Sequence, residues 1–247
     1  MSQQRILLAL QFWEGDKAQA MRVARLVADL EVRHSDRVDF LFVSRFDCTQ
    51  DMDTVKYVSG KFNVHTFINR HRRGSGWPFG CNDLWFGTLD HVYTERLASK
   101  MPDYKFILTF EADSCPLRRD WILRLENFWD SAKVKICGPM VPHGPAEAGH
   151  KHINGNMMVS GDMDFLHWIS RKVGGCNPAA GWDWILAPQF MKLGWANCPL
   201  MRSHWRAPNA LDEGVHKLQE NGAAFLHGVK DDSVINYMRR TALGQPV

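Results

Sequence analysis

Short apolar runs alternate with amphipathic stretches through the first half of the chain. The runs are rich in strand-forming residues and lack helical spacing, which predicts buried strands. These predicted strands are 5–12, 38–43, 63–67 and 106–110. The stretches between them predict helices over 17–34, 51–60 and 82–100. Strand and helix in alternation predict right-handed crossovers, and so a sheet that is mostly parallel with helices on its faces.

The second half of the chain has shorter elements. Strands are expected over 134–137, 154–160 and 195–198. Helices are expected over 119–129, 164–172, 181–194 and 211–221, with a last helix ending at 239–240. A polar, glycine-containing loop is expected over 142–152. No internal repeat or linker divides the sequence, so residues 1–247 are expected to form a single domain.

Two acidic residues follow the fourth predicted strand. Glu111 and Asp113 lie at the carboxyl end of the strand, where ligands bind in open α/β sheets. Because side chains alternate along an extended chain, both carboxylates point to the same side. Converging carboxylates repel each other unless a cation or a proton lies between them, which favours a Mg²⁺ or Mn²⁺ site. A pair of solvated acids in a turn is the alternative interpretation.

The carboxyl ends of the first two predicted strands, with the loops that follow, are expected to bind a nucleotide base and ribose. The first end carries Gln11 and Phe12, and the second carries Phe46 and Asp47. A basic, glycine-rich loop over 69–80 includes Arg73, whose guanidinium suits phosphate. A solvated surface loop explains the same segment equally well.

Composition sets limits on the function. The 247 residues are 45% hydrophobic, which is enough for one α/β core. The net charge of +3 comes from 30 basic and 27 acidic residues, and so mild a basicity does not establish nucleic-acid binding. Six cysteines without a Cys-x-x-Cys pair favour reduced thiols in a cytoplasmic protein. No signal peptide or membrane-spanning run is expected.

Three histidines in the expected loop raise the question of zinc. His143, His150 and His152 lie close together in the sequence. Their spacing is irregular and no cysteine supports them, so a zinc site is disfavoured.

Three separated pieces of the chain resemble, in order, nucleotide-sugar glycosyltransferases of the A-type fold. The first is Phe110-Glu-Ala-Asp-Ser-Cys-Pro-Leu followed by Asp120-Trp-Ile-Leu-Arg-Leu, which is similar to the family's Asp-x-Asp turn and helix. The second consists of Ile153-Asn-Gly-Asn and Gly181-Trp-Asp-Trp-Ile-Leu-Ala. The third is Leu226-His-Gly-Val-Lys-Asp. One departure is that the first acid of the turn is glutamate.

The resemblance implies a set of roles. Asp113 would bind a Mn²⁺ or Mg²⁺ ion directly, Glu111 would touch the ion or the ribose, and His227 would complete the protein ligands. Lys230 would assist at the diphosphate of a nucleoside-diphosphate sugar donor. Residues 1–113 would form the nucleotide-sugar-binding half and residues 114–247 the acceptor-side half. His227 also fits a buried histidine with only structural partners.

Asp183 is the candidate general base for the acceptor hydroxyl, if the anomeric configuration inverts. It lies in the first turn of an expected helix, and Trp182 and Trp184 would form apolar walls for sugar stacking. A helix cap is the alternative role for Asp183. If the configuration is retained, Asp183 would position the acceptor.

The acceptor is the least constrained part of the prediction. Clustered arginines suggest a polyanion if they share the face of the metal site: Arg70, Arg72, Arg73, Arg118, Arg119, Arg202, Arg206, Arg239 and Arg240. The compact size resembles bacteriophage glycosyltransferases that modify hydroxymethylated pyrimidines in DNA. DNA is therefore the leading named acceptor, against a protein, a glycan or a small molecule. A metal-dependent nucleotidyltransferase or phosphohydrolase, and a non-catalytic binding module, are the competing classes.

Overall fold

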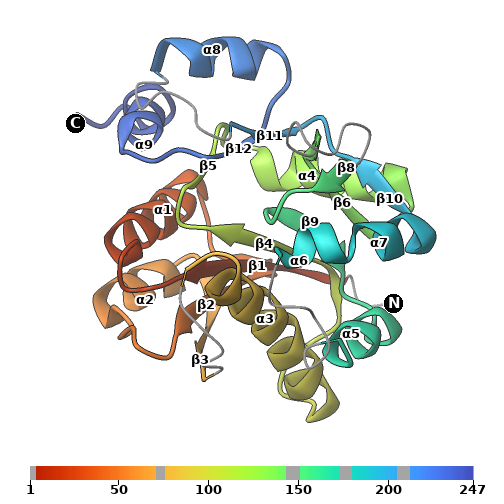
Figure 1. Ribbon diagram of the computed structural model, residues 1–247. Coiled ribbons are helices and arrows are strands. Elements are labelled where there is room, and N and C mark those ends of the chain that lie inside the picture. Colours follow the sequence, from red (N-terminus) through yellow and green to blue (C-terminus); the bar gives the residue numbers. More distant parts are fainter. Residues whose placement is uncertain (1–3, 71–75, 143–150, 173–179, 205–211, 247) are drawn as a thin grey trace.

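The architecture is described from a computed structural model, which describes residues 4–70, 76–142, 151–172, 180–204 and 212–246. Its centre is a seven-stranded sheet in the order β10-β6-β9-β4-β1-β2-β3 (Figure 1). The strands are β1 (Arg5–Phe12), β2 (Ser35–Arg45), β3 (Phe62–Asn69), β4 (Tyr104–Glu111), β6 (Ile136–Gly138), β9 (Met157–Ser160) and β10 (Trp195–Asn197). β9 runs antiparallel to both neighbours, and the other pairs are parallel. The predicted mixed, mostly parallel sheet flanked by helices is confirmed.

Two hydrophobic cores lie on the two faces of this sheet. Ile6, Leu8 and Leu10 of β1 face one core, and Leu7 and Ala9 face the other, as the two-residue period of a strand requires. The first core is covered by α1 (Lys17–Leu30), α2 (Met52–Ser59), α4 (Trp121–Ala132) and α9 (Ser233–Met238). The second is covered by α3 (Phe79–Leu97), α5 (Met163–Ser170), α6 (Trp182–Ile185) and α7 (Ala187–Leu193). Both faces being covered explains why the strands appear as nearly continuous apolar runs in the sequence.

Two smaller sheets complete the described strands. β11 (Met201–Ser203), β12 (Phe225–His227) and β5 (Ser114–Pro116) form one, near helix α8 (Asp212–Glu220) in Figure 1. β7 (Met140–Pro142) and β8 (Lys151–Ile153) form the other. These two short strands occupy the ends of the segment expected to be a loop. After α9, the chain continues as a π-helix, η2 (Arg239–Leu243).

The expected helix over 181–194 is in fact two helices. α6 ends at Ile185 and α7 begins at Ala187, with Leu186 as the cap residue between them, and Pro188 lies in the first turn of α7. Proline lacks a backbone N–H and its ring clashes with the preceding turn, so a continuous helix cannot pass through this position. The first expected helix is also shorter than predicted, because Glu31 is already extended.

A buried carboxylate connects four strands at the amino-terminal edge of the sheet. Asp39 of β2 is 1% exposed and pairs with the Arg5 guanidinium of β1, whose Nε lies 3.0 Å from Oδ1. The Tyr104 hydroxyl of β4 donates to Asp39 Oδ2 at 2.8 Å, and the Asn63 amide of β3 donates to Oδ1 at 3.3 Å. His65 of β3 lies 3.7 Å from the same carboxylate. This network therefore ties the four strands together at the edge opposite to Glu111 and Asp113.

No helix in the described part of the chain is both long enough and apolar enough to cross a membrane.

Candidate functional site

Glu111, Asp113 and His227 come together at the carboxyl edge of the sheet. His227 Nε2 lies 3.3 Å from Glu111 Oε2 and 3.2 Å from Asp113 Oδ1. One ligand atom from each residue lies within 4.8 Å of the others. Asp113 and His227 are buried and Glu111 is half-buried. The cluster is therefore open on the glutamate side.

Sheet register explains how a residue so late in the chain reaches this edge. β12 pairs antiparallel with β5, and His227 lies opposite Ser114, the neighbour of Asp113. The Asp113 carbonyl then accepts hydrogen bonds from the backbone N–H groups of Gly228 at 3.0 Å and Val229 at 2.9 Å. Backbone pairing of β12 with β5 is thus enough to place the His227 imidazole beside the two carboxylates.

Gly228 makes this close approach possible. Its φ is +97°, and a Cβ built on it would lie 2.4 Å from the His204 carbonyl oxygen. Both the dihedral and the space exclude a side chain. The glycine next to His227 in the sequence is therefore a steric requirement of the site.

Asn156 holds the turn that carries the two acids. Its Oδ1 accepts from the Glu111 backbone N–H at 2.9 Å and from the Ser114 hydroxyl at 2.5 Å. Asn156 is completely buried, so these bonds are shielded from water. This asparagine is the last residue of the motif Ile153-Asn-Gly-Asn, and it fixes the turn that carries both acids.

The donor set fits a hard divalent cation. Two carboxylates and one imidazole are available, and the buried Asp113 Oδ1 faces His227 Nε2, itself a potential ligand atom. His227 Nδ1 lies 3.2 Å from the Ser203 hydroxyl, which orients the ring so that Nε2 faces the acids. Lys230 Nζ pairs with Asp113 Oδ2. Lys230 thus already lies beside the cluster.

Electrostatics show how strongly these groups interact. Burial disfavours the charge on Asp113, but the contact with His227 and the charge of Lys230 outweigh it and lower the pKa of that carboxyl. Burial likewise opposes the charge on His227, yet Asp113 and Glu111 raise its pKa above the usual range. The three side chains are thus strongly coupled, and a bound divalent cation would balance the charge of the two carboxylates.

A third acid near the cluster was not predicted from the sequence. Burial, together with the charges of Glu111 and Asp113, raises the pKa of Asp16 to about 6. Asp16 immediately precedes α1 and accepts from the Trp13 backbone N–H at 2.8 Å. Nothing in its own stretch of the sequence marks its nearness to Glu111 and Asp113.

Asp183 lies beside the cluster, in the first turn of α6. Its Oδ2 lies 3.5 Å from His152 Nε2, a nitrogen that accepts from the Trp184 indole N–H at 3.0 Å. Burial and the charge of Glu111 raise the pKa of Asp183 to about 7. A carboxyl with this pKa exchanges protons readily near neutral pH, as a general base must.

The predicted aromatic walls of Asp183 need a correction. Trp182 is 4% exposed and stacks on Trp85 with ring centroids 3.6 Å apart, so it belongs to the core. Trp184 is exposed, and both Trp77, from the segment before α3, and His152 lie against its ring. The Asp183 side chain accepts from the Trp184 N–H in the first turn of α6, so its alternative role at the helix start stays open.

The residues predicted for the nucleotide are only partly at the surface. The Gln11 amide donates to the Thr88 hydroxyl at 2.8 Å, and Phe12 is completely buried, so both side chains serve the packing of β1. Phe46 and Asp47 follow β2 at the carboxyl edge, where Arg45 pairs with Asp47 at 3.1 Å. Arg73 lies outside the described residues, as do His143 and His150 of the histidine group.

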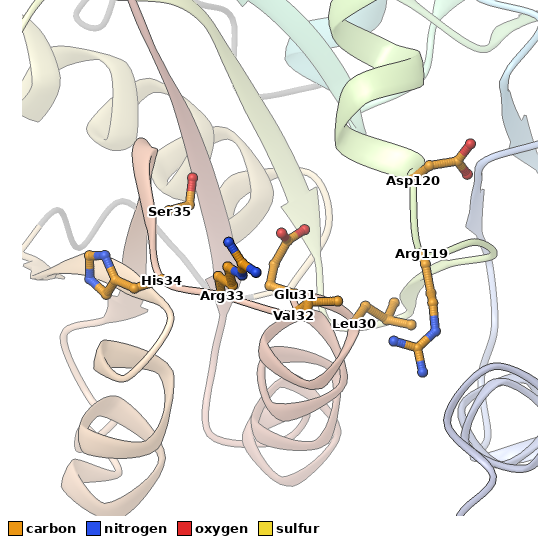
Figure 2. A pocket seen from close by; sticks show the side chains of 8 residues that line it. All are labelled: Leu30, Glu31, Val32, Arg33, His34, Ser35, Arg119 and Asp120. Carbon is orange, nitrogen blue, oxygen red and sulfur yellow. The ribbon is translucent and has the colours of Figure 1, made fainter.

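The described arginines do not all gather at this edge. The Arg119 guanidinium donates to the Ala242 carbonyl of η2, the π-helix that also contains Arg239 and Arg240. Arg119 also lines a hollow of about 440 Å³ with Glu31 and Arg33 (Figure 2). An adjoining hollow includes Ile6. Ile6 lies five residues before Gln11, and Gln11 is paired with Glu111 in the sheet. At about 3.3 Å per residue, these hollows lie roughly 16 Å along the strand from the cluster.

Comparison with known proteins identifies the fold. The sequence matches no protein-family model and no curated protein. In structure it is similar to the glycosyltransferase GlyE of Streptococcus pneumoniae TIGR4, with a TM-score of 0.51 and 10% identity over 94% of this chain and 56% of GlyE. Mouse xyloside xylosyltransferase 1, in its apo form, gives a TM-score of 0.49 and 12% identity over 91% of this chain and 97% of that one.

TarS 1–349 of S. aureus, in complex with UDP-GlcNAc, gives a TM-score of 0.36 and 12% identity over 59% of this chain and 37% of that one. This chain thus spans about half of GlyE and less of TarS. The likeness to GlyE concerns the fold: this chain has the α/β architecture of A-type glycosyltransferases.

Proposed function

We propose that this protein is a metal-dependent glycosyltransferase that moves a sugar from a nucleoside-diphosphate sugar to an acceptor hydroxyl. The observation that carries the proposal is the Glu111, Asp113 and His227 cluster at the carboxyl edge of an A-type glycosyltransferase sheet. Carboxylate-rich sites of this kind suit Mg²⁺ or Mn²⁺ with phosphate oxygens as further ligands.

Each residue has a defined task in this proposal. Asp113 and His227 would hold the ion, and Glu111, on the open side, would complete the set or meet the ribose. Lys230 adds a positive charge where the diphosphate would lie. When bound, the ion supplies Lewis-acid stabilisation of the departing nucleoside diphosphate.

Asp183 is the proposed general base if the reaction inverts the anomeric carbon. The acceptor oxygen forms a bond to that carbon while the bond to the diphosphate oxygen breaks. The bonding electrons leave with the nucleoside diphosphate, and the acceptor proton passes to the Asp183 carboxylate. If the reaction retains configuration, Asp183 would instead accept a hydrogen bond from the acceptor and position it.

Hydroxymethylated pyrimidine in DNA stays a prediction for the acceptor, as do a protein, a glycan or a small molecule. A metal-dependent nucleotidyltransferase or phosphohydrolase is the alternative from another class, because the same three ligands serve it. The two classes release different products: a nucleoside diphosphate in one, and pyrophosphate or phosphate in the other.

Donor binding with and without metal tests the proposal. A panel of uridine and guanosine diphosphate sugars would be titrated by calorimetry with Mn²⁺, Mg²⁺ or EDTA, and the released phosphates identified by chromatography. We expect one donor to bind only with metal and to release a nucleoside diphosphate. Asp113→Asn should abolish this, whereas Asp120→Asn, an exposed aspartate before α4, should not. Metal-independent binding, or release of pyrophosphate, would contradict the assignment.

A further inference from the structure

We propose that Trp77 and Trp184 form a binding corner for the acceptor and that this acceptor is a saccharide. The proposal rests on the proposed glycosyl transfer and names its substrate class. The two indole rings lie 6.0 Å apart between centroids at an interplanar angle of 68°. We call this pair the tryptophan corner.

Both rings of the tryptophan corner are exposed. Trp77 is 58% exposed and Trp184 is 37% exposed, whereas most large aromatic side chains of the described chain are buried. Leaving adjacent indoles in water forgoes burial that would stabilise the fold, at about 25 cal/mol per Å² of apolar surface. Exposed apolar surface of this kind, next to a candidate site, is typical of ligand binding.

The corner surrounds the carboxylate of Asp183. A Cβ built on Gly181 would lie 2.5 Å from Asp183 Oδ1 and 3.4 Å from Trp77 Nε1, so both atoms sit over the same glycine. On the other side, Trp184 Nε1 and Asp183 Oδ2 approach the same nitrogen of His152. A ligand whose ring stacks on either indole would therefore have its edge beside the Asp183 carboxylate.

Buried contacts hold the two rings in place. Asn82, in the first turn of α3, donates to the Ala180 carbonyl at 3.0 Å and accepts from the Trp182 N–H at 2.8 Å. The stack of Trp85 on Trp182 joins the same two segments inside the core. Trp77 precedes α3 and Trp184 belongs to α6, so these contacts fix the corner in advance of binding and reduce the ordering cost.

The corner also adjoins the proposed metal site. A Cβ on Gly155 would lie 3.7 Å from the Trp182 ring and 3.9 Å from Glu111 Oε1. Gly155 therefore lies between Trp182 of α6 and Glu111, the acid on the donor side. An acceptor in the corner would have its hydroxyl groups between Asp183 and the metal site.

The chemistry favours a saccharide over a nucleic acid. A sugar ring has an apolar C–H face to stack on indole and hydroxyl groups that donate to carboxylates. Two carboxylates are available to accept from such hydroxyl groups, Asp183 at the corner and Glu111 beyond Gly155. A phosphate backbone needs basic partners; Arg119 lies at the opposite edge, and Arg45 and Lys230 at the carboxyl edge already pair with Asp47 and Asp113.

Two independent measurements test the proposal. The first follows the indole N–H resonances of the ¹⁵N-labelled protein during titration with methyl glycosides of glucose, galactose, N-acetylglucosamine and xylose, without donor. The second compares sugar transfer to the best glycoside with donor hydrolysis by water. Both are repeated for Trp77→Ala and Trp184→Ala, with Leu123→Ala as an exposed control on α4.

We expect one glycoside to shift the Trp77 and Trp184 resonances. Each alanine variant should lose about ten- to a hundredfold in kcat/KM for transfer, a larger loss than in donor hydrolysis, whereas Leu123→Ala should change neither by more than about twofold. Unchanged transfer in both variants would overturn the proposal. Shifts with hydroxymethylated duplex DNA and with no glycoside would overturn it in favour of a nucleic-acid acceptor. Glycoside shifts without any donor hydrolysis would keep the corner and refute the glycosyl transfer instead.

Discussion

Replacing Asp39 by asparagine should cost the protein about 3 kcal/mol of unfolding free energy. Asn keeps the shape of the side chain but removes the charge that faces Arg5, Tyr104 and His65. Removing one partner of a buried ion pair costs about 3–5 kcal/mol because the other charge stays unpaired. The Arg5 side chain is 22% exposed and retains some hydration, which places the expected loss at the lower end.

Urea unfolding followed by tryptophan fluorescence measures this loss. Tyr104→Phe is the matched control, because it removes a single hydrogen bond to the same carboxylate and should cost about 1 kcal/mol. Asp39→Asn should therefore unfold at clearly lower urea than Tyr104→Phe. Equal midpoints for Asp39→Asn and wild type would refute the view that this carboxylate holds the strands together.

The pH dependence gives a second check with a definite sign. Burial opposes the charge on Asp39, but His65, Arg5 and Tyr104 outweigh it and hold its pKa below the usual range. A lowered pKa stabilises the folded state above the unfolded value of about 3.9, and the effect is lost as pH falls through the folded value. The gap between wild type and Asp39→Asn should be full at pH 7 and shrink below about pH 4. A constant gap would contradict the ionic origin.

Further predictions concern the site. Asp183→Asn should lower kcat by about a hundredfold or more with little change in donor affinity, and unchanged kinetics would remove Asp183 from the reaction. With a pKa of about 7 for Asp183, wild-type kcat/KM should fall to about one tenth of its plateau at pH 6, and a flat profile would count against a base there. Gly228→Ala should weaken Mn²⁺ binding at least tenfold by calorimetry, because its Cβ meets the His204 carbonyl. Gly222→Ala, with a φ of +83° but open space around it, should not.

Residues inside regular elements were predictable because their signal is local. The apolar run 5–12 became β1 with the same bounds, and Glu111 and Asp113 lie at the carboxyl end of β4 as expected. His227 was predicted as a metal ligand only through the resemblance to a family. The sequence around it does not show that β12 pairs with β5. Three-residue strands have too few positions to reveal an alternation.

Residues that act across the fold escaped prediction. Asn82 and Trp182 are 100 residues apart, and Asn156 meets Glu111 across 45 residues. A single sequence carries no sign of such pairs, because each asparagine is also acceptable as a loop or cap residue. Trp182 was misassigned for a related reason: in the sequence it and Trp184 look alike, and only the packing of Trp85 decides which one is buried.

The residues of the candidate site are synthesised at different times, because β12 comes late in the chain and returns to the end of β4. Asp113 and Lys230 are 117 residues apart, and His227 lies just before the lysine. On the ribosome, the two acids of the β4 turn leave the tunnel well before their imidazole and ammonium partners are synthesised. A nascent chain therefore lacks the complete candidate metal site until β12 pairs with β5. If the cluster binds an ion as proposed, metal binding would report that this late pairing has formed.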